Sequence, residues 1–455
     1  MRDALSPLAM ESTESTDSPA SPSVVELCSQ LIAIDSSNYG PGGPAGERAV
    51  ADYIVERLTE VGYEPVLLES APGRANVLLR VAGREPGLDA LLVHGHMDVV
   101  PAEADQWSVD PFAGVIKDGY IWGRGAMDMK DMVASTVSTL LRWKEKGTGP
   151  RRDIVFAFVA DEEAGGDFGA DWLASEHPEW FTGVGAAISE GGGTPVSEKD
   201  ANGKTHWFYP VGTAERGTLH MRLQARGESG HASRGWADNA VTHLIDALGR
   251  LAHHEWPISL IPTSRAFIEQ TAAALGVAVD LSTDEGVEAA LVAIGPELRS
   301  DVPTRGSLNP TVLQAGYKVN VIPGVAEAEI DVRSIPGTEE AMLEEIDRLL
   351  GPRVTREFVA EAPGISAPFD SEWFSAITDA IVAYDDEAIV LPYLLGGGTD
   401  AKAFAKLGIP GYGFAPLGRD PEGRREGGMH GVDERMPVAA LEIGATILEK
   451  FLTDV

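Results

Sequence analysis

Apolar residues recur along this chain at two spacings, and these spacings predict alternating helices and strands. Segments 24–35 and 46–65 carry apolar residues with the period of an amphipathic helix, and a third helical pattern covers about 131–144. Uninterrupted short apolar runs, which are typical of strands buried on both faces, occur at 76–81, 90–93, 153–159 and 184–189. Strands and helices in this order predict an α/β fold with a largely parallel sheet.

The middle of the chain has a different pattern. Segments 218–225 and 326–333 alternate apolar and polar residues, as expected for strands with one buried and one solvated face. A helical pattern at about 238–252 lies between them, followed by a weakly patterned stretch at about 253–307. We therefore interpret residues 208–337 as an α+β domain inserted into the first.

Helical patterns resume after this insert. They occur at 339–350, 371–384, 400–407 and 437–452. Residues 23–207 and 338–455 are therefore expected to form one discontinuous domain. Residues 1–22 are rich in Ser, Thr, Pro and Glu without apolar periodicity, which predicts a disordered tail. A chain of 455 residues is also too long for one hydrophobic core.

Composition narrows the class of protein. The chain has 36 basic and 70 acidic residues, a formal net charge of −34. A surface of this sign repels phosphate backbones, so we expect no nucleic-acid partner. No apolar stretch approaches the roughly 18 residues needed to span a bilayer, and the N-terminus lacks the features of a signal peptide. We therefore expect no membrane partner. The single cysteine, Cys28, cannot form an internal disulfide, which fits a reducing compartment, and we expect a cytoplasmic protein.

Candidate chemistry begins where one predicted strand ends. His96 and Asp98 follow the apolar run at 90–93 and, being two residues apart in extended chain, point to the same side. A histidine that binds a metal usually donates its second ring N–H to a carboxylate, which Asp98 can supply. The same pattern also occurs in capped turns, so the pair alone is weak evidence for a metal site.

Acidic residues follow the next two predicted strands. Glu162 and Glu163 come after the run at 153–159, and Glu190 comes after the run at 184–189. A single acidic residue in such a place is more often a helix cap than a ligand. Adjacent carboxylates at the end of a buried strand, however, repel each other unless a cation lies between them or one is protonated. The cluster therefore favours a metal site.

Five short motifs occur along the chain in the order HGHMDVVP, WGRGAMDMK, ADEEAG, SEGG and MHGVDE. In this order they resemble the aminoacylase/carboxypeptidase G family of two-zinc metallohydrolases. That family includes acetylornithine deacetylase, succinyl-diaminopimelate desuccinylase, carboxypeptidase S and related dipeptidases. The resemblance implies a three-layer α/β catalytic domain at 23–207 and 338–455, interrupted by a lid and dimerisation domain at 208–337.

The resemblance also implies a ligand set for two divalent metal ions. Zn²⁺ is the expected ion, with Co²⁺ or Mn²⁺ as alternatives. His96 and Glu190 would bind one ion. Glu163 and His430 would bind the other, and Asp128 would bridge the two.

Two further catalytic roles follow from the same resemblance. Glu162 would be the general base that takes a proton from a metal-bridging water, and Asp98 would orient His96. The bridging aspartate of the family precedes a cis peptide bond, so we expect the bond between Asp128 and Met129 to be cis.

Residues of the insert and of a later loop are expected at the substrate. The GHAS motif resembles one whose histidine reaches the active site of the partner subunit, where His231 would stabilise an oxyanion. Asn320 and Arg333 are expected to hold a substrate carboxylate or to line the cleft. Gly398 and Thr399 belong to a glycine-rich loop that would lie near the substrate.

The implied function is hydrolysis of an amide bond next to a free carboxylate. The substrate would be a dipeptide, an N-acyl amino acid or the C-terminal residue of a short peptide. The alternative is biosynthetic deacylation of acetylornithine or succinyl-diaminopimelate. A homodimer through the lid is expected, although the long segment 253–309 leaves open a monomer whose enlarged lid takes the place of the partner.

Overall fold

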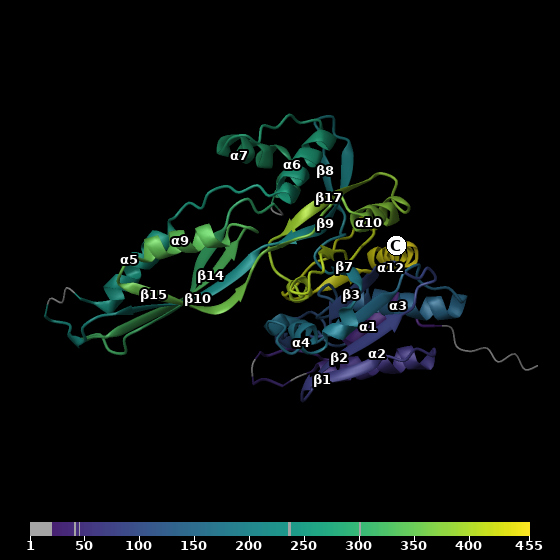
Figure 1. The fold of residues 1–455 in the computed structure, drawn as a ribbon, viewed down its shortest axis with the longest axis horizontal. Coiled ribbons are helices and arrows are strands. Elements are labelled where there is room, and N and C mark those ends of the chain that lie inside the picture. The colour runs from purple at the N-terminus through teal and green to yellow at the C-terminus, as the bar shows by residue number, and fades with distance from the viewer. Residues whose placement is uncertain (1–20, 41, 45, 235–237, 300–301) are drawn as a thin grey trace, which may run out of the picture.

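The computed structural model describes residues 21–40, 42–44, 46–234, 238–299 and 302–455. Residues 1–20 of the predicted tail lie outside this range. Figure 1 shows an elongated molecule with a large sheet and its helices at one end and a smaller, helix-covered sheet at the other. Among the described residues, no helix is both long and apolar enough to cross a membrane.

A ten-stranded sheet organises the larger part, in the order β1-β2-β6-β3-β7-β18-β9-β16, with β8 and β17 also paired to β9. At its centre, β3 (Ala90–His96) runs parallel to both neighbours, β6 (Ile154–Val159) and β7 (Val184–Ser189). The centre of the sheet is therefore parallel, as predicted. The other strands are β1 (Val66–Ala71), β2 (Arg74–Val81), β8 (Val196–Lys199), β9 (Thr205–Glu215), β16 (Ile365–Ser366), β17 (Ala388–Leu395) and β18 (Gly411–Gly413).

Helices cover both faces of this sheet. Successive side chains of a strand point to opposite faces, so Leu91 and Val93 join one hydrophobic core while Leu92 joins another. The first core includes α1 (Val24–Ile32), α2 (Glu47–Glu60), α3 (Lys130–Lys146), α10 (Glu372–Val382) and α12 (Val438–Asp454). The second includes α4 (Ala170–Glu176), the 3₁₀ turn Pro178–Phe181 and α11 (Ala401–Ala405). This arrangement confirms the three layers.

The smaller sheet has four antiparallel strands in the order β12-β14-β10-β15. Leu219, Met221 and Leu223 point from β10 into a core shared with α5 and α9. The opposite face is polar, and Arg222 forms ion pairs there with Glu329 and Glu357 on the flanking strands. The elements are β10 (Gly217–Arg226), α5 (Ala240–Ala252), β12 (Ser307–Ala315), β14 (Val325–Ser334), α9 (Glu339–Leu350) and β15 (Val354–Ala362).

The strand pairing in the two sheets favours limits of the insert other than the predicted residues 208 and 337. β9 still belongs to the ten-stranded sheet, and the chain enters the smaller sheet only at Gly217. At the other end, α9 packs in the core of the smaller sheet and β15 pairs with β10. We therefore propose Gly217 and Ala362 as the outer limits of the insert.

The weakly patterned stretch contains three helices that the periodicity did not predict, namely α6 (Pro262–Leu275), α7 (Asp284–Ala293) and α8 (Pro296–Arg299). They pack on the ten-stranded sheet, where Phe267 of α6 lies in one core with Phe208 of β9. Proline in the first turn of α6 and the Thr283 side chain that caps α7 are the sequence signals of these helices. Most of this stretch thus extends the larger part of the molecule.

Candidate metal centre

Three neighbouring parallel strands bring acidic residues and a histidine to one edge of the sheet. His96 is the last residue of β3. Glu162 and Glu163 lie in the 3₁₀ turn Glu162–Ala164 that follows β6, and Glu190 directly follows β7. Because parallel strands end at the same edge, and ligands of open α/β sheets bind there, the three predicted groups converge.

Two further residues reach this edge from other segments. Asp128 lies in the turn between β5 (Tyr120–Trp122) and α3, and the peptide bond to Met129 is cis, as the resemblance implied. His430 lies in the loop before β19 (Arg435–Pro437). β19 pairs with β5, which in turn pairs with β4 (Val115–Lys117), so this small sheet holds the His430 loop beside the turn that carries Asp128.

The five predicted ligands form two groups of three that share Asp128. Asp128 Oδ1 lies 2.9 Å from His96 Nε2, which also lies 3.8 Å from Glu190 Oε1. Asp128 Oδ2 lies 2.9 Å from His430 Nε2, which also lies 3.4 Å from Glu163 Oε1. The two oxygens of one carboxylate therefore face two separate histidine–carboxylate pairs.

The electrostatics of this edge favour bound cations. Burial strongly raises the pKa of Glu162 and of Glu190, and nearby carboxylates add to that effect. The hydrogen bond to Asp128, together with the one to Glu163, raises the pKa of His430 to about 10. Several carboxyl groups thus share a small volume with the imidazoles of His96 and His430, and bound cations would relieve the repulsion between these carboxyl groups.

The donor atoms fit two divalent metal ions. Each group offers one imidazole nitrogen and two carboxylate oxygens, all within 4.8 Å of one another. Nitrogen and carboxylate ligands of this kind suit Zn²⁺ and other first-row divalent ions. The shared carboxylate of Asp128 would offer one oxygen to each ion, as in the two-metal arrangement that the resemblance implies.

Asp98 contacts His96, although through a different atom from the one expected. His96 Nδ1 lies 2.9 Å from the main-chain oxygen of Asp98 and 3.6 Å from its carboxylate. The carboxylate instead accepts the backbone N–H groups of Glu162 and Glu163, at 3.2 and 3.1 Å. Asp98 therefore ties the end of β3 to the turn that carries both glutamates.

The predicted lid residues cluster with one another. A two-stranded ladder pairs β11 (Gly230–His231) with β13 (Val321–Ile322), and the N–H of Ala232 donates to the carbonyl oxygen of Asn320. The backbones of His231 and Asn320 therefore lie close together. Neither belongs to the two groups of candidate metal ligands.

Thr399 and Arg333 are engaged with residues at the junction of the two sheets. The Thr399 hydroxyl and N–H both donate to Glu215, at 2.6 and 3.0 Å. Arg333 donates to the Thr218 hydroxyl, which also lies 3.4 Å from Nζ of Lys402. Sequence reasoning missed Glu215 and Lys402, because nothing local distinguishes them from ordinary charged residues.

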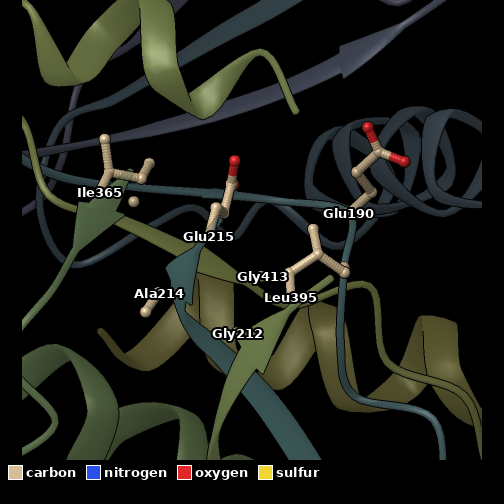
Figure 2. A pocket seen from close by; sticks show the side chains of 9 residues that line it. Glu190, Gly212, Ala214, Glu215, Ile365, Leu395 and Gly413 are labelled. Atoms are coloured by element: carbon tan, nitrogen blue, oxygen red, sulfur yellow. The ribbon is translucent and has the colours of Figure 1, made fainter. Parts of the chain in front are cut away.

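A small cavity separates Glu190 from Glu215. Its volume of about 10 Å³ is close to the space that one water molecule needs. Figure 2 shows Glu190 and Glu215 on either side of Leu395, with both carboxylates pointing the same way. The glycine-rich loop that contains Gly398 and Thr399 is thus anchored close to the metal-ligand edge through Glu215.

Comparisons with known proteins agree with this geometry. Human aminoacylase-1 (Homo sapiens) is 30% identical over 416 residues, which cover 89% of each chain. An M20 family metallo-carboxypeptidase from Sulfolobus solfataricus is 18% identical and superimposes with a TM-score of 0.70 over 95% of this chain and 99% of its own. A dinuclear metal-binding M20 peptidase from Bacillus subtilis is 15% identical, with a TM-score of 0.61 over 94% and 96% of the two chains.

At 18% and 15% sequence identity, the two structural neighbours show only that the fold is shared. The family assignment rests on the sequence itself. Residues 92–454 match the sequence model of peptidase family M20/M25/M40, and this range includes all five candidate metal ligands. The resemblance seen in the five motifs is therefore confirmed, and this chain is a hydrolytic enzyme that belongs to peptidase family M20/M25/M40.

Proposed function

We propose that this enzyme hydrolyses an amide bond next to a free carboxylate. The observation that carries the proposal is the pair of ligand groups joined by Asp128, with the carboxyl of Glu162 beside them. His96 and Glu190 would hold one divalent ion, and Glu163 and His430 the other. Bound at these positions, the ions would supply Lewis-acid activation of water and of the scissile carbonyl.

Glu162 is the residue we propose to move the proton. Burial raises its pKa strongly, and the charges of Asp400 and Glu163 oppose its ionisation further. A carboxyl whose pKa is raised towards the working pH can take a proton from the attacking water and return it to the leaving amine. Glu163 follows it directly in the chain and faces His430, so the two neighbours serve different purposes.

The substrate class is proposed from the relatives and from the cationic groups at the junction of the sheets. Aminoacylase-1 and the metallo-carboxypeptidase carry the names of enzymes that act on N-acyl amino acids and on peptides. Both substrate types place a free carboxylate next to the amide. Arg333 and Asn320 are proposed to receive that carboxylate. Acetylornithine and succinyl-diaminopimelate share this feature, so the preference rests on the relatives. Because these are named as an aminoacylase and a carboxypeptidase, we favour the first two substrate types.

The cellular setting and assembly are likewise proposals. We propose Zn²⁺ as the working ion and a cytoplasmic location. We also propose a homodimer through the four-stranded sheet, in which His231 serves the active site of the partner subunit. The exposed edge strand β12 is where a second copy could extend the sheet.

Metal analysis combined with a substrate panel tests the proposed activity. The purified enzyme, loaded with Zn²⁺ or Co²⁺, would be assayed on dipeptides, N-acyl amino acids, acetylornithine and succinyl-diaminopimelate. We expect two ions per chain and turnover of the first two classes. Glu162→Gln is the matched control, since it should retain the ions and lose turnover. One ion per chain, or equal activity of the variant, would refute the mechanism.

A further inference from the structure

A short segment before α2 runs alongside the stretch that follows His96. Ser36 donates its hydroxyl to the carbonyl oxygen of Met97 at 2.7 Å, and the N–H of Asn38 donates to the carbonyl oxygen of Val99 at 2.9 Å. Ser36 and Asn38 are both buried. This pairing places the side chain of Asn38 beside the carboxylate of Asp98.

The side-chain amide of Asn38 is fully used. Its nitrogen donates to Asp98 Oδ2 at 2.8 Å and to Asp161 Oδ1 at 3.0 Å. Its oxygen accepts from Arg74 Nη2 at 3.0 Å and from the N–H of Gly40 at 2.9 Å. An amide has two donor hydrogens and two acceptor lone pairs, and here all four have partners.

Arg74 fixes which way this amide points. Its guanidinium forms ion pairs with Glu47 and with Asp161, and it donates to the oxygen of Asn38. Arg74 is itself buried. Because a guanidinium can only donate, it holds the oxygen of Asn38 on its own side and turns the nitrogen towards Asp98.

The carboxylate of Asp98 is the point at which this network meets the glutamate turn. One oxygen accepts the N–H of Glu162, and the other accepts both the N–H of Glu163 and the amide of Asn38. Without Asn38, the second oxygen would lose its shortest hydrogen bond and could rotate away from the turn. The backbone of both glutamates would then lose a fixed anchor.

We propose that Asn38 is a positioning residue for this active site, acting through Asp98 to hold Glu162 and Glu163 where base and metal ligand are needed. Asn38 itself lies outside the two ligand groups. Its effect is expected on turnover and on the affinity of the ion held by Glu163 and His430. The roles of the two glutamates come from the proposed function, on which this inference rests.

The test compares Asn38→Ala and the nearly isosteric Asn38→Asp with Ser36→Ala. Ser36 lies on the same segment and is also buried, but its hydroxyl donates to a main-chain oxygen, that of Met97. All three changes remove a buried hydrogen bond, so all should lower the melting temperature. Zn²⁺ titration and the Co²⁺ absorption spectrum report on the metal site independently of any substrate.

We expect Asn38→Ala to weaken one metal site and to lower kcat by about 10–100-fold, the range for residues that orient metal ligands, while KM changes little. Asn38→Asp should lose at least as much, because it replaces the donor with a third carboxylate beside Asp98 and Asp161. Ser36→Ala should keep the metal affinity and kcat of the wild type. If the Asn38 variants behave like Ser36→Ala, the proposal is wrong.

A double-mutant cycle shows whether Asn38 acts through Asp98. Asn38→Ala should have no further effect on metal affinity in an Asp98→Ala background, whereas independent roles would give additive losses. Additive losses would therefore contradict the proposal. Should the wild type hydrolyse no amide in the panel, the proposed function fails, and the metal titrations still decide the role of Asn38.

Discussion

Arg124 and Glu434, which are 310 positions apart in the chain, form a buried ion pair beside the candidate metal centre. Arg124 also donates to the carbonyl oxygen of Gly431 at 2.9 Å, and Glu434 accepts the N–H of Met127 at 2.8 Å. The pair therefore joins the loop that carries His430 to the turn that carries Asp128. It explains how an otherwise exposed loop presents a histidine at a defined place.

Breaking this pair should damage both stability and metal binding. Glu434→Ala leaves the guanidinium of Arg124 buried without its partner, which typically costs about 3–5 kcal/mol in the free energy of unfolding. We expect a matching loss in denaturant unfolding and weaker binding of one ion, measured by Zn²⁺ titration. Glu434→Gln, which keeps an acceptor for Met127, should lose less. Equal stability of Glu434→Ala and wild type would contradict the role of the pair.

Substitutions of the adjacent residues Glu162 and Glu163 should have different effects on turnover and on metal binding. Glu162→Gln removes the proposed base, so turnover should be lost while both ions remain bound. Glu163→Gln removes a proposed ligand and should release one ion or weaken its binding by at least about 10-fold. Inductively coupled plasma analysis and steady-state kinetics on the same samples distinguish them. A Glu162→Gln enzyme with wild-type kcat would show that another group is the base.

Removal of metal should destabilise the enzyme. Without cations, the carboxylates of Asp128, Glu163 and Glu190 repel one another in a largely buried volume. Chelation is therefore expected to lower the melting temperature, and added Zn²⁺ to restore it in a concentration-dependent way. Binding at 100 times Kd corresponds to about 2.7 kcal/mol of stabilisation. His430→Ala is the control, since it should show a smaller shift. A melting temperature unaffected by chelator would argue against the metal centre.

The glycine-rich loop should depend on its anchor. Glu215 accepts two hydrogen bonds from Thr399, so Glu215→Gln exchanges one acceptor oxygen for a donor and frees the loop. We expect KM to rise more than kcat falls, because the metal ligands are untouched. Thr399→Val, which keeps the N–H and removes the hydroxyl, should show a milder form of the same change. A fall in kcat with unchanged KM would place Glu215 in the chemistry instead.

The proposed dimer makes a prediction about subunit exchange. Loss of one oxyanion donor typically lowers kcat by about 10²–10³-fold, and we expect this of His231→Ala. If His231 acts in the partner subunit, mixing His231→Ala with Glu162→Gln should restore activity, because one site of the heterodimer has both groups intact. If it acts within its own chain, the mixture stays inactive. Sedimentation of the wild type would establish the oligomeric state in parallel.

Much of the metal centre could be predicted from the sequence because its parts are local. His96, Glu162 and Glu190 each follow a continuous apolar run, and such runs form the buried centre of a parallel sheet. The ends of neighbouring parallel strands must meet, so local patterns were enough to predict that these side chains converge. Asp128 and His430 were predicted only through the resemblance of their motifs, since no local pattern links them.

The tertiary structure alone decided which atoms meet and where the two sheets divide the chain. The carboxylate of Asp98 holds the glutamate turn rather than the imidazole of His96, and Glu215 reaches Thr399 from 184 positions away. Helices α6 to α8 join the larger sheet, although they lie within the predicted insert. Periodicity reports only whether a segment has a buried face. It does not specify the surface against which that face packs, because this depends on the order in which distant strands pair.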